Sequence, residues 1–400
     1  DDIVDSQHYA AGSIDTAHLA DDQITLAKMA AGTDGNIISY DASGNPVAIA
    51  TGSDGQVLTS GGAGAAPSFA AAPSHRNDII NGGLVVNQEN VTAPADDDYT
   101  IGDLFLHVGE GTPVMSLETD GPQGTRPWQK MVLDANAQGG LAYIVPNDTV
   151  QDYIANGKMS FGIQLKTTAA TIANARIGVI KWTGTADAVT KELVGTWASD
   201  GTNPTLATSL SYENTPANIG LTTSWARHTV EDVTVDSDTK NIILFVWTND
   251  GTITASDVIG FSEWQLNPGS TVHAFSSHGR NIVQHQVDNY LQRYDYNVTA
   301  GEMISGGGVS TGNTTSQAVF HFRTQFYTVP AITSSTAATF LMQDVGFEST
   351  LSSIAFQKVG RSAMRVSGIG ATGLTLGRGM SFYRDGSDTT WIMADARIGV

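Results

Sequence analysis

The sequence predicts an all-β protein with an intertwined trimeric shaft of short β-repeats, a jelly-roll β-sandwich, and a short helix leading into a C-terminal β-sandwich tip domain. Three observations predict this fold class. The 400 residues include 43 Gly, with frequent Thr and Val, which favours strands and tight turns. Two kinds of short repeat open the chain, and repetition is typical of shafts and solenoids. Farther on, strand-length apolar runs alternate with turn residues, and no helical periodicity separates them.

The first repeat has a period of ten residues. The segment 4–10 is followed by similar segments at 14–20 and 24–30. Because ten residues fit neither a heptad nor a hendecad, a coiled coil is disfavoured, although a short helix within 16–29 remains an alternative. We assign residues 1–31 to a decapeptide-repeat shaft.

A second repeat follows with a period of about twenty residues, since 32–39 matches 52–59. Each copy has an Asp-Gly turn, an apolar strand, a Gly-rich turn and a second short strand, which predicts a strand–turn–strand unit. Such thin apolar faces are buried when two or three chains wind together. A disordered linker is the alternative for 61–74. We assign 32–76 to a β-repeat shaft and linker.

Residues 77–279 have the pattern of a β-sandwich or jelly roll. Strand candidates without intervening helices, separated by Gly- and Asn-containing turns, are typical of these folds. The candidates are 83–87, 130–134, 141–145, 158–166, 175–182, 227–235, 241–247 and 258–266.

Residues 280–400 are predicted to form a helix followed by a second β-sandwich. Asn281 is a candidate N-cap for an apolar stripe that runs from Val283 to Tyr294. Strand candidates after it are 317–322, 331–334, 353–357, 364–367 and 390–396. No role is predicted for Arg397, the last charged residue.

The sequence resembles phage tail-fibre proteins in several segments. The run 32–60 resembles shaft repeats of marine phage fibres and, more loosely, the trimeric β-spiral shafts of other viral fibres. The segments 81–88, 99–103 and 259–269 resemble carbohydrate-binding-module-like jelly rolls of phage fibres. The segments 290–294, 320–333 and 393–396 are similar to the helix and tip domain of that family. Asn267 departs from an acidic residue usual in relatives, which puts a structural metal there in doubt.

The resemblance implies a structural virion fibre protein that mediates attachment to the host cell surface by binding a glycan. Implied partners are two further copies in a homotrimer, other virion tail or baseplate proteins, and a bacterial surface glycan or receptor. The implied location is extracellular, on the virion. Alternatives are a capsid-attached or purely structural fibre without a receptor role, a tailspike-type polysaccharide depolymerase, and a bacterial surface adhesin. Because the sequence starts with Asp1, we expect a piece of a longer polypeptide.

Composition excludes several function classes. The net charge of −20, from 40 acidic and 20 basic residues, argues against nucleic-acid binding and against docking on anionic membranes. No apolar run approaches the roughly 20 residues of a membrane helix, so we expect no membrane insertion. The absence of cysteine excludes disulfides and thiolate metal sites.

No motif of an enzyme is present, so we predict no catalytic residue, metal or cofactor. The sequence has no nucleophile elbow, phosphate loop or dinucleotide fingerprint. The histidines at 273, 278 and 285 lack a metal-binding pattern, although a ring of His285 around a trimer axis is an alternative. The acidic run 96–98 lacks the ligand spacing of a calcium loop and is interpreted as a solvated turn.

Tryptophans are the better functional candidates, because sugar sites combine flat aromatic faces with polar groups. Trp182 and Trp197 flank a polar excursion at strand–loop borders, and we predict them as carbohydrate-binding residues, with plain packing as the alternative. Trp225, Trp247 and Trp264 lie within or beside strand candidates and are assigned to the core.

Overall fold

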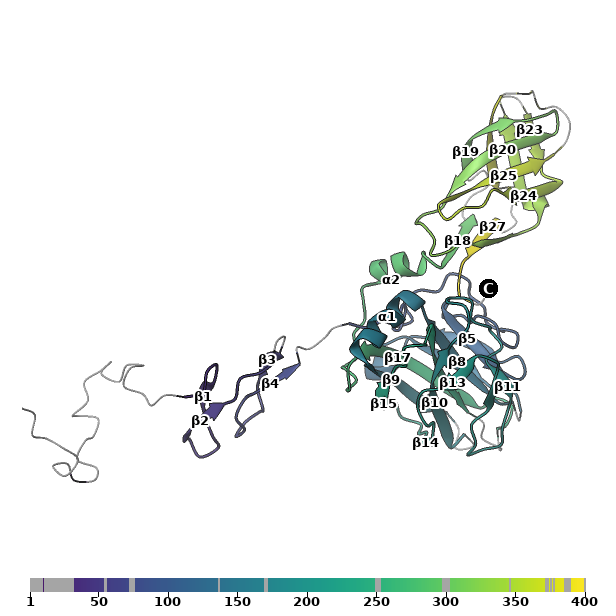
Figure 1. The fold of residues 1–400 in the computed structure, drawn as a ribbon. Coiled ribbons are helices and arrows are strands. Elements are labelled where there is room, and N and C mark those ends of the chain that lie inside the picture. Colours follow the sequence, from purple (N-terminus) through teal and green to yellow (C-terminus); the bar gives the residue numbers. More distant parts are fainter. Residues whose placement is uncertain are drawn as a thin grey trace, which may run out of the picture. The chain divides into compact units, whose positions relative to one another are not determined.

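The computed structural model describes residues 10, 32–53, 56–71, 76–135, 137–168, 172–248, 253–296, 303–344, 347–370, 374, 376, 378–384 and 390–398. The chain divides into two compact units, Asp1–Ser74 and His75–Val400, whose elements are shown in Figure 1. The decapeptide repeats predicted for 1–31 lie outside the described residues, apart from Ala10. Strands make up most of the regular structure, which confirms the all-β prediction.

The described part of the first unit contains two antiparallel hairpins, one for each copy of the longer repeat. They are formed by β1 (Ile37–Tyr40) with β2 (Pro46–Ile49), and by β3 (Gln56–Thr59) with β4 (Ser68–Ala71). The first turn is closed by the Asp41 carboxylate, whose Oδ1 accepts the backbone N–H groups of Ser43 and Asn45 at 2.8 and 2.9 Å. The predicted strand–turn–strand unit is therefore confirmed, whereas winding with other chains stays a prediction.

The second unit begins with two sheets that face each other. The six-stranded sheet has the order β13-β10-β16-β8-β5, with β14 pairing β10. Its strands are β5 (Phe105–Gly109), β8 (Gly139–Val145), β10 (Asn174–Trp182), β13 (Leu210–Tyr212), β14 (Ile219–Gly220) and β16 (Asn241–Thr248). A separate small hairpin pairs β11 (Val194–Thr196) with β12 (Thr205–Leu206).

The opposite, five-stranded sheet has the order β15-β9-β17-β7-β6. Its strands are β6 (Val114–Glu118), β7 (Trp128–Val132), β9 (Lys158–Thr167), β15 (Ala226–Thr234) and β17 (Val258–Pro268). Alternate side chains of both sheets, such as Phe161, Trp264 and Leu244, fill the core between them. The jelly-roll β-sandwich prediction is confirmed.

Two predictions for this region were wrong. The helix α1 (Asn147–Asn156) separates β8 from β9, where no helix was expected. Its buried side chains, Val150 and Tyr153, pack on the core, and Gly157 ends it with a left-handed φ of 74°. The strand candidate 83–87 is a loop. The Asn81 side chain donates to the Val86 carbonyl and accepts from the Val86 N–H, so these backbone groups stabilise a turn and do not pair with a neighbouring strand.

The chain continues through α2 (Arg280–Val287) into two further sheets. The three-stranded sheet contains β18 (Leu291–Tyr296), β21 (Ala331–Ser334) and β27 (Thr390–Asp395). The seven-stranded sheet has the order β23-β22-β26-β19-β20-β25-β24. Its strands are β19 (Met303–Ser310), β20 (Thr315–His321), β22 (Phe340–Asp344), β23 (Phe347–Thr350), β24 (Ser353–Gln357), β25 (Ala363–Ile369) and β26 (Gly379–Arg384). Within the described residues, short 3-10 turns occur at Pro122–Gly124 and Ala337–Thr339.

The predicted helix is shorter than expected, and its cap was wrong. The N-cap is Gly279 rather than Asn281, and the helix ends at Val287. Leu291 and Tyr294, which continue the apolar stripe in sequence, lie instead on β18 and pair with β27. The spacing of apolar residues here fits a helix as well as a strand. The strand forms because pairing with β27 satisfies its backbone N–H and C=O groups.

Candidate functional site

The two sheets of the jelly roll differ in what covers their outer faces. On the six-stranded sheet, alternate residues such as Phe245 and Trp247 form a second buried apolar layer on the outer side. On β9 of the five-stranded sheet, Phe161 and Leu165 face the core, whereas Gln164 and Lys166 point to the other side. This outer face of the five-stranded sheet, called here the β9 face, presents aromatic and polar groups together.

Trp128, Trp225 and Lys166 form the centre of the β9 face. The two indole rings meet edge to face, with centroids 5.4 Å apart and an interplanar angle of 78°. The Lys166 ammonium lies 4.0 Å from the Trp128 centroid and 4.8 Å from the Trp225 centroid. Trp128 Nε1 donates to Asp120 Oδ1 at 2.7 Å, and this hydrogen bond lowers the pKa of the Asp120 carboxyl. Trp128 is only 4% exposed, so it packs behind the half-buried Trp225 and fixes the orientation of that ring, which is the one of the pair that a ligand can reach.

Gly260 makes room for the two rings. It pairs with Lys130 on one side and Lys166 on the other, so these three residues share the β9 face. A Cβ at Gly260 would lie 2.9 Å from Trp128 Cε3 and 3.0 Å from Trp225 Cη2. A glycine is thus needed here for close approach of the indoles to the sheet.

A second polar group lies farther along the same face. The Arg126 guanidinium is 5.4 Å from the Phe275 centroid, and its Nε is 3.5 Å from Glu263 Oε1. Burial lowers the pKa of Arg227, which donates to a backbone carbonyl at 2.8 Å. Glu263 Oε1 and Gln164 Oε1 are buried and accept no hydrogen bond from a described residue. Such acceptors suit hydroxyl donors.

The predicted sugar-binding residues lie on the other sheet. Trp182 ends β10, is only 9% exposed and belongs to the apolar layer over the six-stranded sheet. Its Nε1 donates to the Thr185 carbonyl at 2.8 Å, and Gly184 packs against the ring. Trp197 is half-buried, with its centroid 6.2 Å from that of Phe245. Both rings therefore pack on this layer, and their role in binding stays a prediction.

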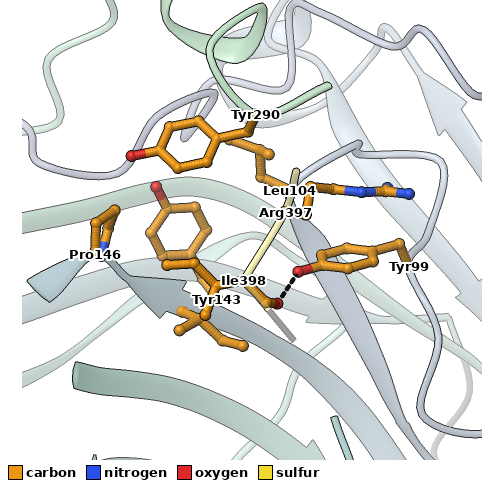
Figure 2. A pocket seen from close by; sticks show the side chains of 8 residues that line it. Tyr99, Leu104, Tyr143, Pro146, Tyr290, Arg397 and Ile398 are labelled. Atoms are coloured by element: carbon orange, nitrogen blue, oxygen red, sulfur yellow. Dashed lines mark hydrogen bonds between the residues drawn. The ribbon is translucent and has the colours of Figure 1, made fainter. Parts of the chain in front are cut away.

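The end of the chain packs against the jelly roll, and Arg397 has a structural role there. Its guanidinium forms ion pairs with Asp395 and Glu89 and lies 3.8 Å from the Tyr99 centroid. An adjoining cavity has a volume of about 20 Å³. Figure 2 shows the side chains that line it, among them Tyr99, whose hydroxyl donates to the Ile398 carbonyl. Burial raises the pKa of Tyr99, so its hydroxyl stays neutral. At that volume the cavity holds about one water molecule.

A larger cleft of about 410 Å³ adjoins the same segment, and its lining includes Asp187, Val329 and Arg397. Its charged groups are already satisfied. Asp187 accepts from Asn147 N, Asn241 Nδ2 and the Tyr327 hydroxyl, and Arg397 is paired as described. The cleft therefore offers little free polar chemistry for orienting a ligand.

Metal binding was considered for the acidic run 96–98 and for the histidines. Among the residues that the structure describes, no group of three or more His, Asp or Glu side chains is placed to hold a metal ion. Asn267, considered above as a departure from an acidic position, bonds the backbone of Thr271 and His273 and so closes the turn after β17. Neither described helix has the length and apolar character needed to cross a membrane.

Sequence reasoning missed Trp128 and assigned Trp225 to the core. A signal for Trp128 was present, because Trp128 and Lys130 alternate with the core residue Met131. Trp225 directly precedes β15, two positions before Arg227, so it also lies on the outward side. Trp247 and Trp264 are fully buried, which confirms their assignment to the core. The pairing of the two outer tryptophans depends on strand order, which a single sequence does not give.

No protein-family model matches the chain, and no curated protein matches it. Among solved structures, it is similar to the CBM22-1 xylan-binding domain of Paenibacillus barcinonensis Xyn10C, at 13% identity over 42% of this chain and 86% of that chain, with a TM-score of 0.27. It is similar to TmCBM61 in complex with β-1,4-galactotriose, at 12% identity over 48% and 99%, with a TM-score of 0.29. A family 11 carbohydrate-binding module from Clostridium thermocellum has 11% identity over 45% and 96%, with a TM-score of 0.26.

Proposed function

We propose that this chain is a structural virion fibre protein, a tail fibre, that attaches to a host cell surface by binding a glycan on the β9 face. The observation that carries the proposal is the half-buried indole of Trp225, held edge to face against the buried Trp128 at 5.4 Å, on a sheet face that also presents amide and charged groups. Pyranose rings stack on indoles, and their hydroxyls hydrogen-bond to polar side chains such as those of Gln164 and Lys166, which lie on the same face of β9.

The proposed assembly is a homotrimer with an intertwined shaft. In the single chain, the first strand of each shaft hairpin, β1 and β3, leaves large apolar side chains in water, with Ile38, Tyr40 and Leu58 exposed by 58%, 64% and 46%. Neighbouring copies would cover these side chains and supply the missing core. The resemblance of the repeats to phage fibre shafts supports the same assembly.

Trimeric assembly would raise the apparent affinity of weak sugar sites. A shallow sheet face that stacks one or two rings is expected to bind with modest affinity, because little of the ligand is enclosed. Three linked sites raise the apparent affinity for a surface that carries many glycan chains. An extracellular location on the virion, with tail or baseplate proteins as further partners, follows from this proposal.

The proposal is tested by measuring binding of the purified chain to host surface polysaccharide. Trp225→Ala removes the more accessible stacking ring and should weaken binding about tenfold per site, since such contacts contribute roughly 1–1.5 kcal/mol. Trp225→Phe, which keeps a ring, should retain most of the binding. Thermal unfolding of each variant shows whether the fold is intact. Unchanged binding by a folded Trp225→Ala variant contradicts the β9 face as the site.

Trp182→Ala and Trp197→Ala test the competing location in the same assay. Because Trp182 is nearly buried, we expect Trp182→Ala to lower the unfolding temperature. Trp197→Ala should keep both stability and binding if the β9 face is the site. Loss of binding in a stable Trp197→Ala variant would move the site to the six-stranded sheet.

Two alternative functions can be distinguished from this proposal by experiment. A fibre without a receptor role, attached to the capsid or purely structural, predicts that the chain binds no host polysaccharide and does not compete with virion adsorption. A tailspike-type depolymerase predicts release of reducing ends from capsule polysaccharide. We expect no such release, because acidic side chains of the β9 face already interact with other side chains. Asp120, for example, accepts a hydrogen bond from the Trp128 indole N–H.

A further inference from the structure

Positive charge is concentrated in one part of an acidic chain. The span 303–384, from the first residue of β19 to the last residue of β26, has six basic and two acidic residues, a net charge of +4. The rest of the chain has 14 basic and 38 acidic residues. The flanking acids Glu302, Asp385 and Asp388 lie outside the described residues, and with all three the net charge is still +1. The seven-stranded sheet is therefore the part of the chain whose charge favours an anionic partner.

Three of these basic residues lie on the hairpin that joins β24 to β25, called here the cationic hairpin (357–365; both strands are labelled in Figure 1). They are Lys358, Arg361 and Arg365. The ladder pairs Arg365 with Gln357, the neighbour of Lys358 in sequence, so the three side chains lie at the same end of the sheet. Lys358 and Arg361 are exposed, and Arg365 is half-buried.

The backbone of the cationic hairpin is anchored on the loop after β20. The N–H groups of Phe322 and Phe326 donate to the carbonyls of Ser362 and Arg361, at 3.0 and 2.8 Å. Arg361 Nε donates in return to the Phe326 carbonyl at 2.6 Å, which leaves its two terminal NH₂ groups without a partner among the described residues. Lys358 has a left-handed φ of 51°, which glycine or asparagine adopts at lower cost. The two exposed cations are therefore held on a fixed backbone.

Within the described part of the chain, no carboxylate neutralises these cations. Neither Lys358, Arg361 nor Arg365 forms an ion pair with a described residue. Arg365 donates to a neutral amide, and its Nε is buried without an acceptor. By contrast Arg323, on the neighbouring loop, lies 3.5 Å from the Asp288 carboxylate. The cationic hairpin thus has positive charge that its described surroundings do not match.

The two acids of the span 303–384 lie elsewhere on the sheet. Asp344 and Glu348 belong to β22 and β23, at the other end of the strand order from β24 and β25. Ser349, next to Glu348, packs against Gly370, which follows the far end of β25. Since a strand rises about 3.3 Å per residue, β25 places roughly 20 Å between that end and the cationic hairpin. Physiological salt screens exposed charges beyond about 8 Å, so these acids do not cancel the charge of the hairpin.

We infer that the cationic hairpin is a second binding site, which takes phosphate groups of an anionic surface polymer. Arginine presents parallel N–H donors that match the oxygens of a phosphate, and lysine adds a point charge. Arg361 supplies such donors, with Lys358 and Arg365 beside it. The site lies on the C-terminal sheets and not on the jelly roll, so it does not depend on the glycan site proposed for the β9 face.

The net charge of −20 does not oppose this contact. A nucleic-acid duplex or a flat anionic membrane contacts a broad surface and meets many of the 38 acids outside the span 303–384. A flexible polymer can reach the cationic hairpin with a few phosphate groups, while repulsion by acids beyond about 8 Å is screened. Binding at one site should be weak, should fall as salt increases, and should gain from three linked copies.

The test measures binding of the full chain to polyphosphate by affinity electrophoresis, with neutral dextran as the control polymer. Lys358→Asn, Arg361→Gln and Arg365→Gln should each weaken binding about threefold, since single exposed ion pairs contribute little. Asparagine tolerates the φ at position 358, so Lys358→Asn should fold normally. Lys240→Gln, at an exposed lysine of the jelly roll, is the matched control and should bind as the wild type does.

Several outcomes would overturn the inference. An equal loss in Lys240→Gln and in the hairpin variants would show a nonspecific effect of charge. Tighter binding of duplex DNA than of polyphosphate would assign the hairpin to nucleic acid instead, and absence of polyphosphate binding at low salt would remove the site.

Trp225→Ala separates this site from the proposed glycan site. A folded Trp225→Ala variant should bind polyphosphate as tightly as the wild type, and loss of that binding would overturn the assignment to the cationic hairpin. Unchanged binding of host polysaccharide by the same variant would contradict the β9 face and leave the cationic hairpin standing.

Discussion

Arg397 is a buried charge that joins two parts of the second unit. It is 5% exposed, and its Nη1 also donates to the Asp103 carbonyl at 3.0 Å. The Nη2 atom lies 2.7 Å from Glu89 Oε2 but without the alignment of a hydrogen bond. The pair with Asp395 is the better aligned interaction. No sequence pattern predicted this role, because the partners of Arg397 in the jelly roll, such as Asp103, are separated from it by about three hundred residues.

Within the acidic turn 96–98, the ionised form of Asp97 is disfavoured by its surroundings. Burial, with the neighbouring charges of Glu192 and Asp96, raises the pKa of Asp97 to about 6. The unfolded-state value is about 3.9, so the folded state holds the proton more tightly than the unfolded chain does. The free energy of unfolding therefore receives its full contribution from Asp97 below pH 4 and loses it as the pH rises through 6.

Asp97→Asn should accordingly raise the unfolding temperature at pH 7.5, because it removes the charge that burial penalises. Asparagine tolerates the positive φ of 53° at this position, so the backbone is not strained. The gain should disappear at pH 4, where Asp97 is protonated in the wild type. Glu192→Gln should give a smaller gain in the same direction. A thermal shift that is equal at both pH values would show that charge is not the cause.

At the scale of elements, long strands were predictable and irregular segments were not. The strands β8, β9, β10, β16 and β17 coincide with predicted runs because each buries a continuous or alternating apolar set. The short strands β11 to β14 escaped prediction because two or three residues carry no period. The helix α1 was missed because its apolar stripe is only two residues, Val150 and Tyr153.

Gly260 on β17 allows a direct test of how this strand positions the tryptophans. Gly260→Ala places a Cβ within 3.0 Å of atoms of both Trp128 and Trp225, so at least one ring has to move. Overpacking of this kind costs about 1–3 kcal/mol, and we expect a lower free energy of unfolding together with weaker glycan binding. Gly220→Ala on β14 is the control, since nothing lies within 4 Å of its Cβ position. Equal effects of the two substitutions would contradict the packing described for the β9 face.

For the whole molecule, the sequence predicted the all-β class and the jelly roll but not the face that carries the candidate site. The two-sheet jelly roll followed from strands with alternating burial. The choice between Trp182 and Trp225 required knowing that Trp182 is buried in the apolar layer over its sheet, whereas Trp225 is only half-buried on the other sheet. Coverage of a sheet depends on contacts between distant segments, so it is not encoded in the local spacing of tryptophans.

Assembly is the second property of the whole molecule that remains a prediction. We expect light scattering to give the mass of a trimer at micromolar concentration. Ile38→Asp together with Leu58→Asp should shift the chain toward monomers, because these side chains are exposed in the single chain and would be covered only by other copies. The jelly roll should remain folded in this variant. A folded wild-type monomer at that concentration would refute the trimeric shaft.

The central claim is that the β9 face binds the glycan, and oxidative footprinting of tryptophan in the presence and absence of host polysaccharide tests it most directly. Trp225 is half-buried and modifiable on the β9 face, whereas the half-buried Trp197 lies over the opposite sheet and serves as the internal reference. The account predicts that saturating polysaccharide slows oxidation of Trp225 and leaves the rate at Trp197 unchanged. Protection of Trp197 without protection of Trp225 would contradict it.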